Sequence, residues 1–143
     1  MTVTAPRTTV QTAKTIRMIH GSLLTGVLLF AIVGHFLLRP TLSGGTALPS
    51  ALVAGLLGLC LVLFIVALML VKRVPRRSSD ASLDLFWSTA VTPAMIAWVP
   101  LQAAGLIAVF LYAETGSSPA IAIAAVAVVL MAVLRPRHFE RRR

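Results

Sequence analysis

Four long apolar runs divide the chain, and basic or polar residues break the pattern between them. The clearest run, residues 51–71, contains 21 residues without a charged or strongly polar side chain. About 20 apolar residues in a helix cover the ~30 Å hydrocarbon core of a bilayer. This run therefore predicts a transmembrane helix. The composition agrees, since 58% of all residues are hydrophobic and only 12% are charged, against about 25% charged in a soluble domain.

The other runs predict three further spans, so we expect an all-α fold: a polytopic membrane protein with four transmembrane helices. The spans cover about 16–38, 51–71, 90–113 and 118–134. The third is the hardest to bound, because its helix can begin near Phe86 or only at Pro93. A helix pairs its backbone groups internally, which the interior of a bilayer requires.

Short connections between the runs predict one domain over residues 16–135, with successive helices side by side and antiparallel. The expected order is an up-down-up-down bundle. Residues 1–15 are rich in threonine and lack apolar periodicity, which predicts a flexible cytoplasmic tail. Residues 136–143 predict a second, basic cytoplasmic tail.

Positive charge falls almost entirely on one side of this arrangement. Of the 13 basic residues, only Arg39 lies on the other side. The rest are Arg7, Lys14, Arg17, Lys72, Arg73, Arg76, Arg77, Arg135, Arg137, Arg141, Arg142 and Arg143. Because cytoplasmic loops of membrane proteins carry an excess of Lys and Arg, we expect both termini in the cytoplasm and the chain in the inner (plasma) membrane. The same rule accounts for the net charge of +9 without nucleic acid as a partner.

Two histidines of the first span are candidate haem ligands. His20 and His35 are fifteen residues apart, which is about 22 Å along a helix. Each haem would need a second ligand from another helix. No other span contains a histidine, so a symmetric dimer or a His–Met pair would have to supply it. The alternative is that both are polar residues at the two membrane interfaces, and we predict no bound cofactor and no metal site.

Gln102 is the only amide well inside a span. Such a side chain usually hydrogen-bonds across a helix interface, and the predicted partners are Ser22, Thr25 and His20. A contact with a solute is the alternative. Pro93 and Pro100 should bend the same helix.

Small residues recur four apart in several spans, which is typical of close helix packing. The pairs are Ser22 and Gly26, Ala51 and Gly55, Ala54 and Gly58, and Ala120 and Ala124. They favour a compact bundle or association with another membrane protein or a second copy, and the pattern does not separate these.

The sequence lacks the residues of most membrane catalysts. All four acidic residues, Asp80, Asp84, Glu114 and Glu140, lie outside the predicted spans, whereas proton-coupled carriers keep an ionisable group inside the membrane. We therefore predict no enzymatic activity. Basic residues of the loop and tail predict contact with anionic lipids, and they are Arg76, Arg77, Arg141, Arg142 and Arg143.

The layout of four spans in this length resembles small, uncharacterised four-helix inner-membrane proteins of bacteria. The resemblance lies in the layout alone and implies no activity. Small multidrug-resistance transporters share the layout but carry a glutamate in the first helix, which residues 16–38 lack. Three functions stay open: a non-catalytic accessory or assembly subunit of a membrane complex, a small channel or carrier for an uncharged or hydrophobic solute, and a haem-bearing electron-transfer anchor.

Overall fold

The computed structural model describes residues 9–39, 48–78 and 82–140, and every regular element in them is helical. The elements are α1 (Thr9–Val33), a π-helix η1 (Gly34–Leu38), α3 (Ser50–Val71), α4 (Leu83–Thr115), α5 (Ser118–Val133) and α6 (Pro136–Glu140). Four helical stretches are long and apolar enough to cross a membrane: Thr12–Leu38, Ser50–Val71, Leu85–Thr115 and Ser118–Glu140. The predicted all-helical fold with four candidate spans is confirmed.

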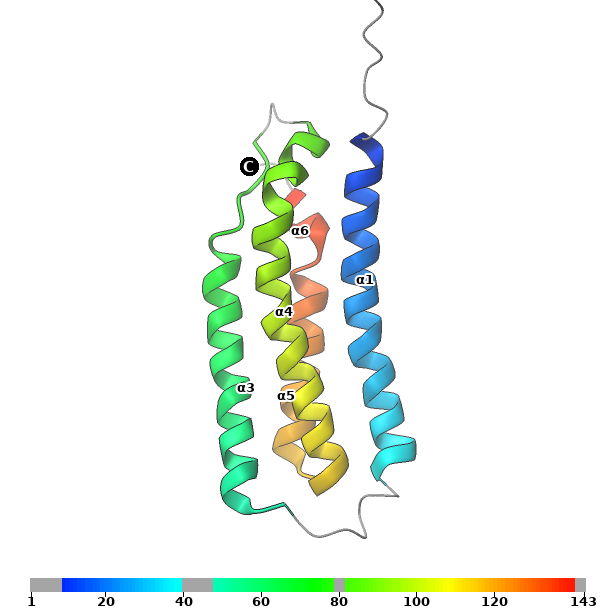
Figure 1. The fold of residues 1–143 in the computed structure, drawn as a ribbon, viewed down its shortest axis with the longest axis vertical. Coiled ribbons are helices and arrows are strands. Elements are labelled where there is room, and N and C mark those ends of the chain that lie inside the picture. The colour runs from blue at the N-terminus through cyan, green and yellow to red at the C-terminus, as the bar shows by residue number, and fades with distance from the viewer. Residues whose placement is uncertain (1–8, 40–47, 79–81, 141–143) are drawn as a thin grey trace, which may run out of the picture.

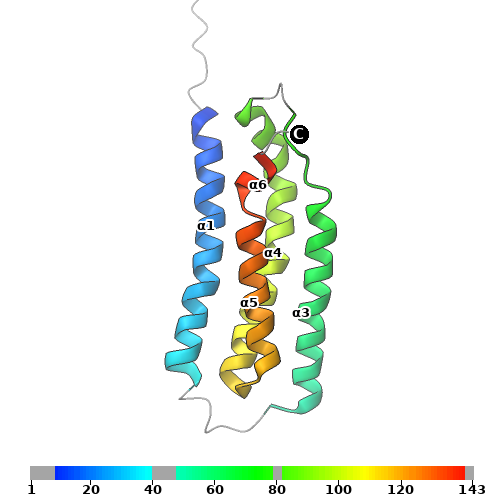
Figure 2. The same cartoon turned by 180° about the vertical axis from the view of Figure 1, so that it is seen from behind.

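The long helices stand side by side around α4, and consecutive ones run in opposite directions (Figures 1 and 2). Half of the most apolar part of α4 is buried, against 11% for α1 and 17% for α3. The helix α4 packs against α3, α5 and α1. The expectation that successive helices are neighbours fails for the first pair, because α1 packs on α4 instead of α3.

Small residues explain why α4 takes the central place. Ala94, Ala97, Ala104 and Ala108 of α4 are fully buried, so neighbouring helices approach it from several sides. At Gly105, an added Cβ would lie 3.1 Å from Cγ1 of Val27 on α1 and 3.2 Å from Cβ of Ala127 on α5. Three helices therefore meet at this glycine.

Two helix starts differ from the predicted boundaries. The helix α4 begins at Leu83 instead of residue 90, because Ser82 caps it and its Oγ accepts a hydrogen bond from the Leu85 N–H at 3.2 Å. It then continues through Pro93 and Pro100 without a break in the helix. The helix α1 begins at Thr9, so residues 9–15 are helical and differ from the predicted flexible tail. Residues 1–8 lie outside the described part.

The fourth span ends in a turn and a second short helix. The helix α5 covers most of the predicted residues 118–134 and ends at Val133, and α6 follows directly from Pro136. Phe139 of α6 is buried against Trp98 and its neighbours. Residues 136–140 of the predicted basic tail are thus packed on the bundle, and residues 141–143 lie outside the described part.

Candidate functional site

Most of the polar chemistry of the bundle lies at the end where α1 begins, which we call the basic end (Figure 1). The helix α3 finishes there, α4 begins there and α6 lies there. The described basic residues of this end are Lys14, Arg17, Lys72, Arg73, Arg76, Arg77, Arg135 and Arg137. Arg39 lies at the opposite end.

Glu140 ties α6 to two other helices. Its carboxylate accepts hydrogen bonds from Arg17 Nη2 at 2.6 Å and from Arg17 Nε at 3.2 Å, a two-point pairing that is stronger than a neutral hydrogen bond. The Trp87 Nε1–H also donates to Glu140 Oε1, at 3.1 Å. The Glu140 side chain is only 10% exposed, so this network holds α6 against α1 and α4.

His20 and Trp98 satisfy backbone carbonyls at the end of α5. The last carbonyls of a helix have no N–H partner within it. The Trp98 Nε1–H donates to the Leu134 carbonyl at 2.9 Å. His20 Nε2 lies 3.1 Å from the Met131 carbonyl oxygen and must be the donor, because a carbonyl only accepts. The two rings meet edge to face, 4.7 Å apart.

His35 belongs to a separate polar group at the opposite end. Its Nδ1 lies 3.0 Å from the Tyr112 hydroxyl oxygen. The same oxygen accepts a hydrogen bond from Arg39 Nη1 at 3.0 Å. The Arg39 guanidinium lies over the Tyr112 ring, 5.1 Å from its centroid. The two candidate haem ligands, His20 and His35, are therefore not brought together. Among the described residues, no three His, Cys, Asp or Glu side chains gather as a metal-binding group.

Gln102 faces α1, but among the described residues no hydrogen bond joins it to a predicted partner. A Cβ added to Gly26 would lie 3.9 Å from Gln102 Nε2. Ser22 and Thr25 are exposed on α1, and His20 bonds the Met131 carbonyl. The structure thus places the half-buried Gln102 at the α1–α4 seam without assembling the predicted cluster.

The pairs of small residues divide into inward and outward faces. Ala120 and Ala124 of α5 are buried in the bundle. Ala51 and Ala54 of α3 are exposed, as are Gly55 and Gly58, and a Cβ at either glycine would have nothing within 4 Å. One face of α3 is therefore open.

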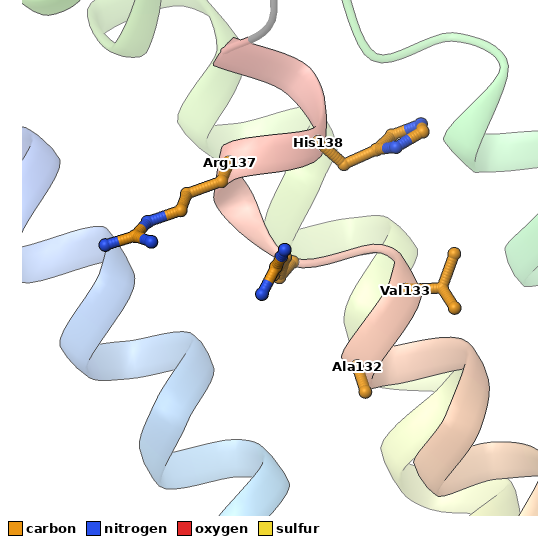
Figure 3. A pocket seen from close by; sticks show the side chains of 5 residues that line it. Ala132, Val133, Arg137 and His138 are labelled. Atoms are coloured by element: carbon orange, nitrogen blue, oxygen red, sulfur yellow. The ribbon is translucent and has the colours of Figure 1, made fainter.

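Two cavities at the basic end are lined partly by cations. One, of about 420 Å³, lies at the α5–α6 turn and is lined by Ala132, Val133, Arg135, Arg137 and His138 (Figure 3). The other, also about 420 Å³, is lined by Val71, Lys72, Val74, Arg76, His138 and Phe139. Of the predicted lipid-contacting arginines, Arg76 lines a cavity, the Arg77 N–H donates to the Phe139 carbonyl at 3.4 Å, and the final three lie outside the described part.

A third cavity is apolar and lies over α4, with α1 on one side and α3 on the other. It has a volume of about 470 Å³ and is lined by Phe30, Leu56, Leu106, Ile107 and Phe110. Leu56 lies on a different side of α3 from Ala51, Ala54 and Gly58, so the cavity is separate from the open face of α3.

Sequence reasoning missed Trp87, Trp98 and Tyr112 as members of the polar groups. A usable signal was present, because a buried Trp or Tyr usually finds a partner for its N–H or O–H. Comparison of the chain with protein-family models, with curated proteins and with solved structures finds no match.

Proposed function

We propose that this protein is a non-catalytic accessory or assembly subunit of a larger membrane complex, and that it binds a transmembrane helix of another protein through α3. Its helices cross the inner (plasma) membrane in an up-down-up-down order, with both termini in the cytoplasm. The orientation follows from the positive-inside rule and from the basic residues gathered at one end of the bundle.

The observation that carries this proposal is the open face of α3. Ala51, Ala54, Gly55 and Gly58 are exposed there, and the glycines have free space above them. In lipid, small residues let a second backbone approach closely, and the packing that follows drives helix association.

Charge argues for a different protein as the partner instead of a second copy. Two copies in one membrane share an orientation, so pairing through α3 would bring Lys72, Arg73 and Arg76 of one copy beside those of the other. Like charges separated by less than a Debye length of ~8 Å repel. A partner helix followed by acidic residues on the cytoplasmic side would instead complement these cations.

The test is affinity purification of the tagged full chain at native expression level in mild detergent. We expect a stoichiometric membrane partner with the native sequence, and we expect the variant Gly55→Leu with Gly58→Leu to lose it. Both glycines have nothing within 4 Å of an added Cβ, so the bundle should fold. Gly21→Leu is the matched control, because that glycine is equally unobstructed on α1, and it should retain the partner.

Purification of the native chain alone or only as a homo-oligomer would contradict the subunit proposal. It would favour the second candidate, a small channel or carrier for an uncharged or hydrophobic solute. The observation behind this candidate is Gln102, which is half-buried at the α1–α4 seam. Its amide forms no hydrogen bond with another described residue, so it is available to a solute. A haem-bearing anchor, the third candidate, would instead purify with a Soret band.

A further inference from the structure

We propose that the cavity at the α5–α6 turn binds the phosphate of an anionic membrane phospholipid. This cavity is lined only by α5, α6 and the turn between them, so its test does not depend on association through α3. It is motivated by three observations: the mixed lining of the cavity, the lack of ion-pair partners for its arginines among the described residues, and its position at the end of an apolar helix.

The lining changes from apolar to cationic along the direction of α5. Ala132 and Val133 belong to the last apolar turn of the span, and Arg135, Arg137 and His138 follow it. Arg137 and His138 project to opposite sides of the turn, above Ala132 and Val133 (Figure 3). A phospholipid has the same order, since its acyl chains and glycerol lie deeper than its phosphate. The cavity of about 420 Å³ is within the usual range of ligand sites, about 300–1,000 Å³.

The arginines of the cavity carry charge that the described residues do not neutralise. Arg135 and Arg137 are exposed, and neither forms an ion pair with a described residue. Glu140, an acidic residue whose side chain is described at this end, already pairs with Arg17. Arg guanidinium groups bind phosphate with two parallel hydrogen bonds, so two arginines without an ion-pair partner in the described part of the chain suit a phosphate diester.

The second cationic cavity extends the same surface. It shares His138 with the first and adds Lys72 and Arg76. The Arg77 N–H donates a hydrogen bond to the Phe139 carbonyl. This bond joins the loop after α3 to α6, so the two cavities lie next to each other. A headgroup with a second anionic or hydroxyl group could thus contact both.

The experiment uses the purified full chain in detergent, titrated with phosphatidylglycerol and with phosphatidylcholine of the same acyl chains, with bound lipid counted by native mass spectrometry. We expect preferential binding of phosphatidylglycerol. The variant Arg135→Gln with Arg137→Gln should weaken it on the order of 25-fold, from roughly 5-fold for each basic residue near an anionic surface. Phosphatidylcholine binding should change much less.

The control is Lys14→Gln with Arg73→Gln, which removes the same charge at the same end. Both residues are exposed, and neither lines the two cationic cavities. If this control weakened phosphatidylglycerol binding as much as the cavity variant, the attraction would be diffuse and the proposal would be wrong.

Inorganic phosphate, added to the unaltered protein at the concentration of the lipid, separates a lipid from a soluble ligand. We expect no displacement, because phosphate alone cannot contact Ala132 and Val133 as a lipid does. Displacement of the bound phosphatidylglycerol would mean that the cavity binds a soluble anion, and the proposed lipid site would be wrong. This arm needs no variant, so it tests the proposal even if a substitution impairs folding.

Discussion

At the scale of single residues, Pro136 determines which groups donate hydrogen bonds to the last carbonyls of α5. A residue before proline avoids the helical backbone, so α5 ends and α6 begins anew. The His138 N–H donates to the Arg135 carbonyl instead of the Leu134 carbonyl. His20 and Trp98 donate to the carbonyls of Met131 and Leu134. His20 stood out in the sequence as a ligand candidate. Its actual partner is a backbone carbonyl of a distant helix, and no spacing of side chains predicts such a contact.

Glu140 supplies a prediction at this scale. Glu140→Gln removes the counter-charge of Arg17 but leaves an oxygen for the Trp87 N–H. Hydrogen bonds to charged groups contribute about 1.5–3 kcal/mol, and the Arg17 side chain is 42% exposed, so solvent screens part of this. We expect a loss of about 1 kcal/mol in the free energy of unfolding, measured by titration with sodium dodecyl sulfate in mixed micelles.

The control for this substitution is Glu114→Gln, which removes an equal charge at the opposite end and should change stability little. A double-mutant cycle with Arg17→Gln should give a favourable coupling energy between residues 17 and 140. Equal effects of the two glutamate substitutions, with no coupling to Arg17, would show that the ion pair does not stabilise the fold.

At the scale of elements, apolar length predicted all four candidate spans, while the ends and the packing partners of these helices depended on other features. Pro93 suggested a late start for α4, yet the helix runs through it from the Ser82 cap, since neighbouring helices make proline tolerable in a transmembrane helix. Loop length suggested that α1 would pack on α3. The small residues of α4, Ala104 and Gly105 among them, decide the arrangement, and a linear sequence does not reveal which partner meets them.

Gly105 tests the central role of α4. In Gly105→Ile, the new side chain would displace Val27 on α1 and Ala127 on α5, whose atoms lie 3.1 and 3.2 Å from an added Cβ. Overpacking of this kind costs about 1–3 kcal/mol, and we expect that loss in the same detergent titration. Gly21→Ile gains the same side chain where nothing lies within 4 Å, so it should change stability little. Similar losses in both variants would mean that the effect is not due to packing at the three-helix contact.

At the scale of the whole molecule, the described cations divide the bundle into two unlike ends. Eight lie at the basic end, as named above, against Arg39 at the other. The sequence predicts this division because each basic cluster directly follows or precedes an apolar run. It does not predict that the last cluster folds back, because Phe139 and Glu140 find their contacts on α1 and α4 only in three dimensions.

We propose that this asymmetry sets the orientation in the membrane, and the orientation can be measured on one helix. Ser50 begins α3, Ser78 follows its end, and both are exposed. In a background with the single native cysteine removed by Cys60→Ser, we expect Ser50→Cys to react with a membrane-impermeant maleimide on intact cells. Ser78→Cys should react only after permeabilisation, because the cluster from Lys72 to Arg77 holds its end of α3 in the cytoplasm. The opposite labelling pattern would show that the molecule has the inverted orientation, with the cationic cavities in the outer leaflet. Labelling of both positions on intact cells would show that α3 does not cross the membrane.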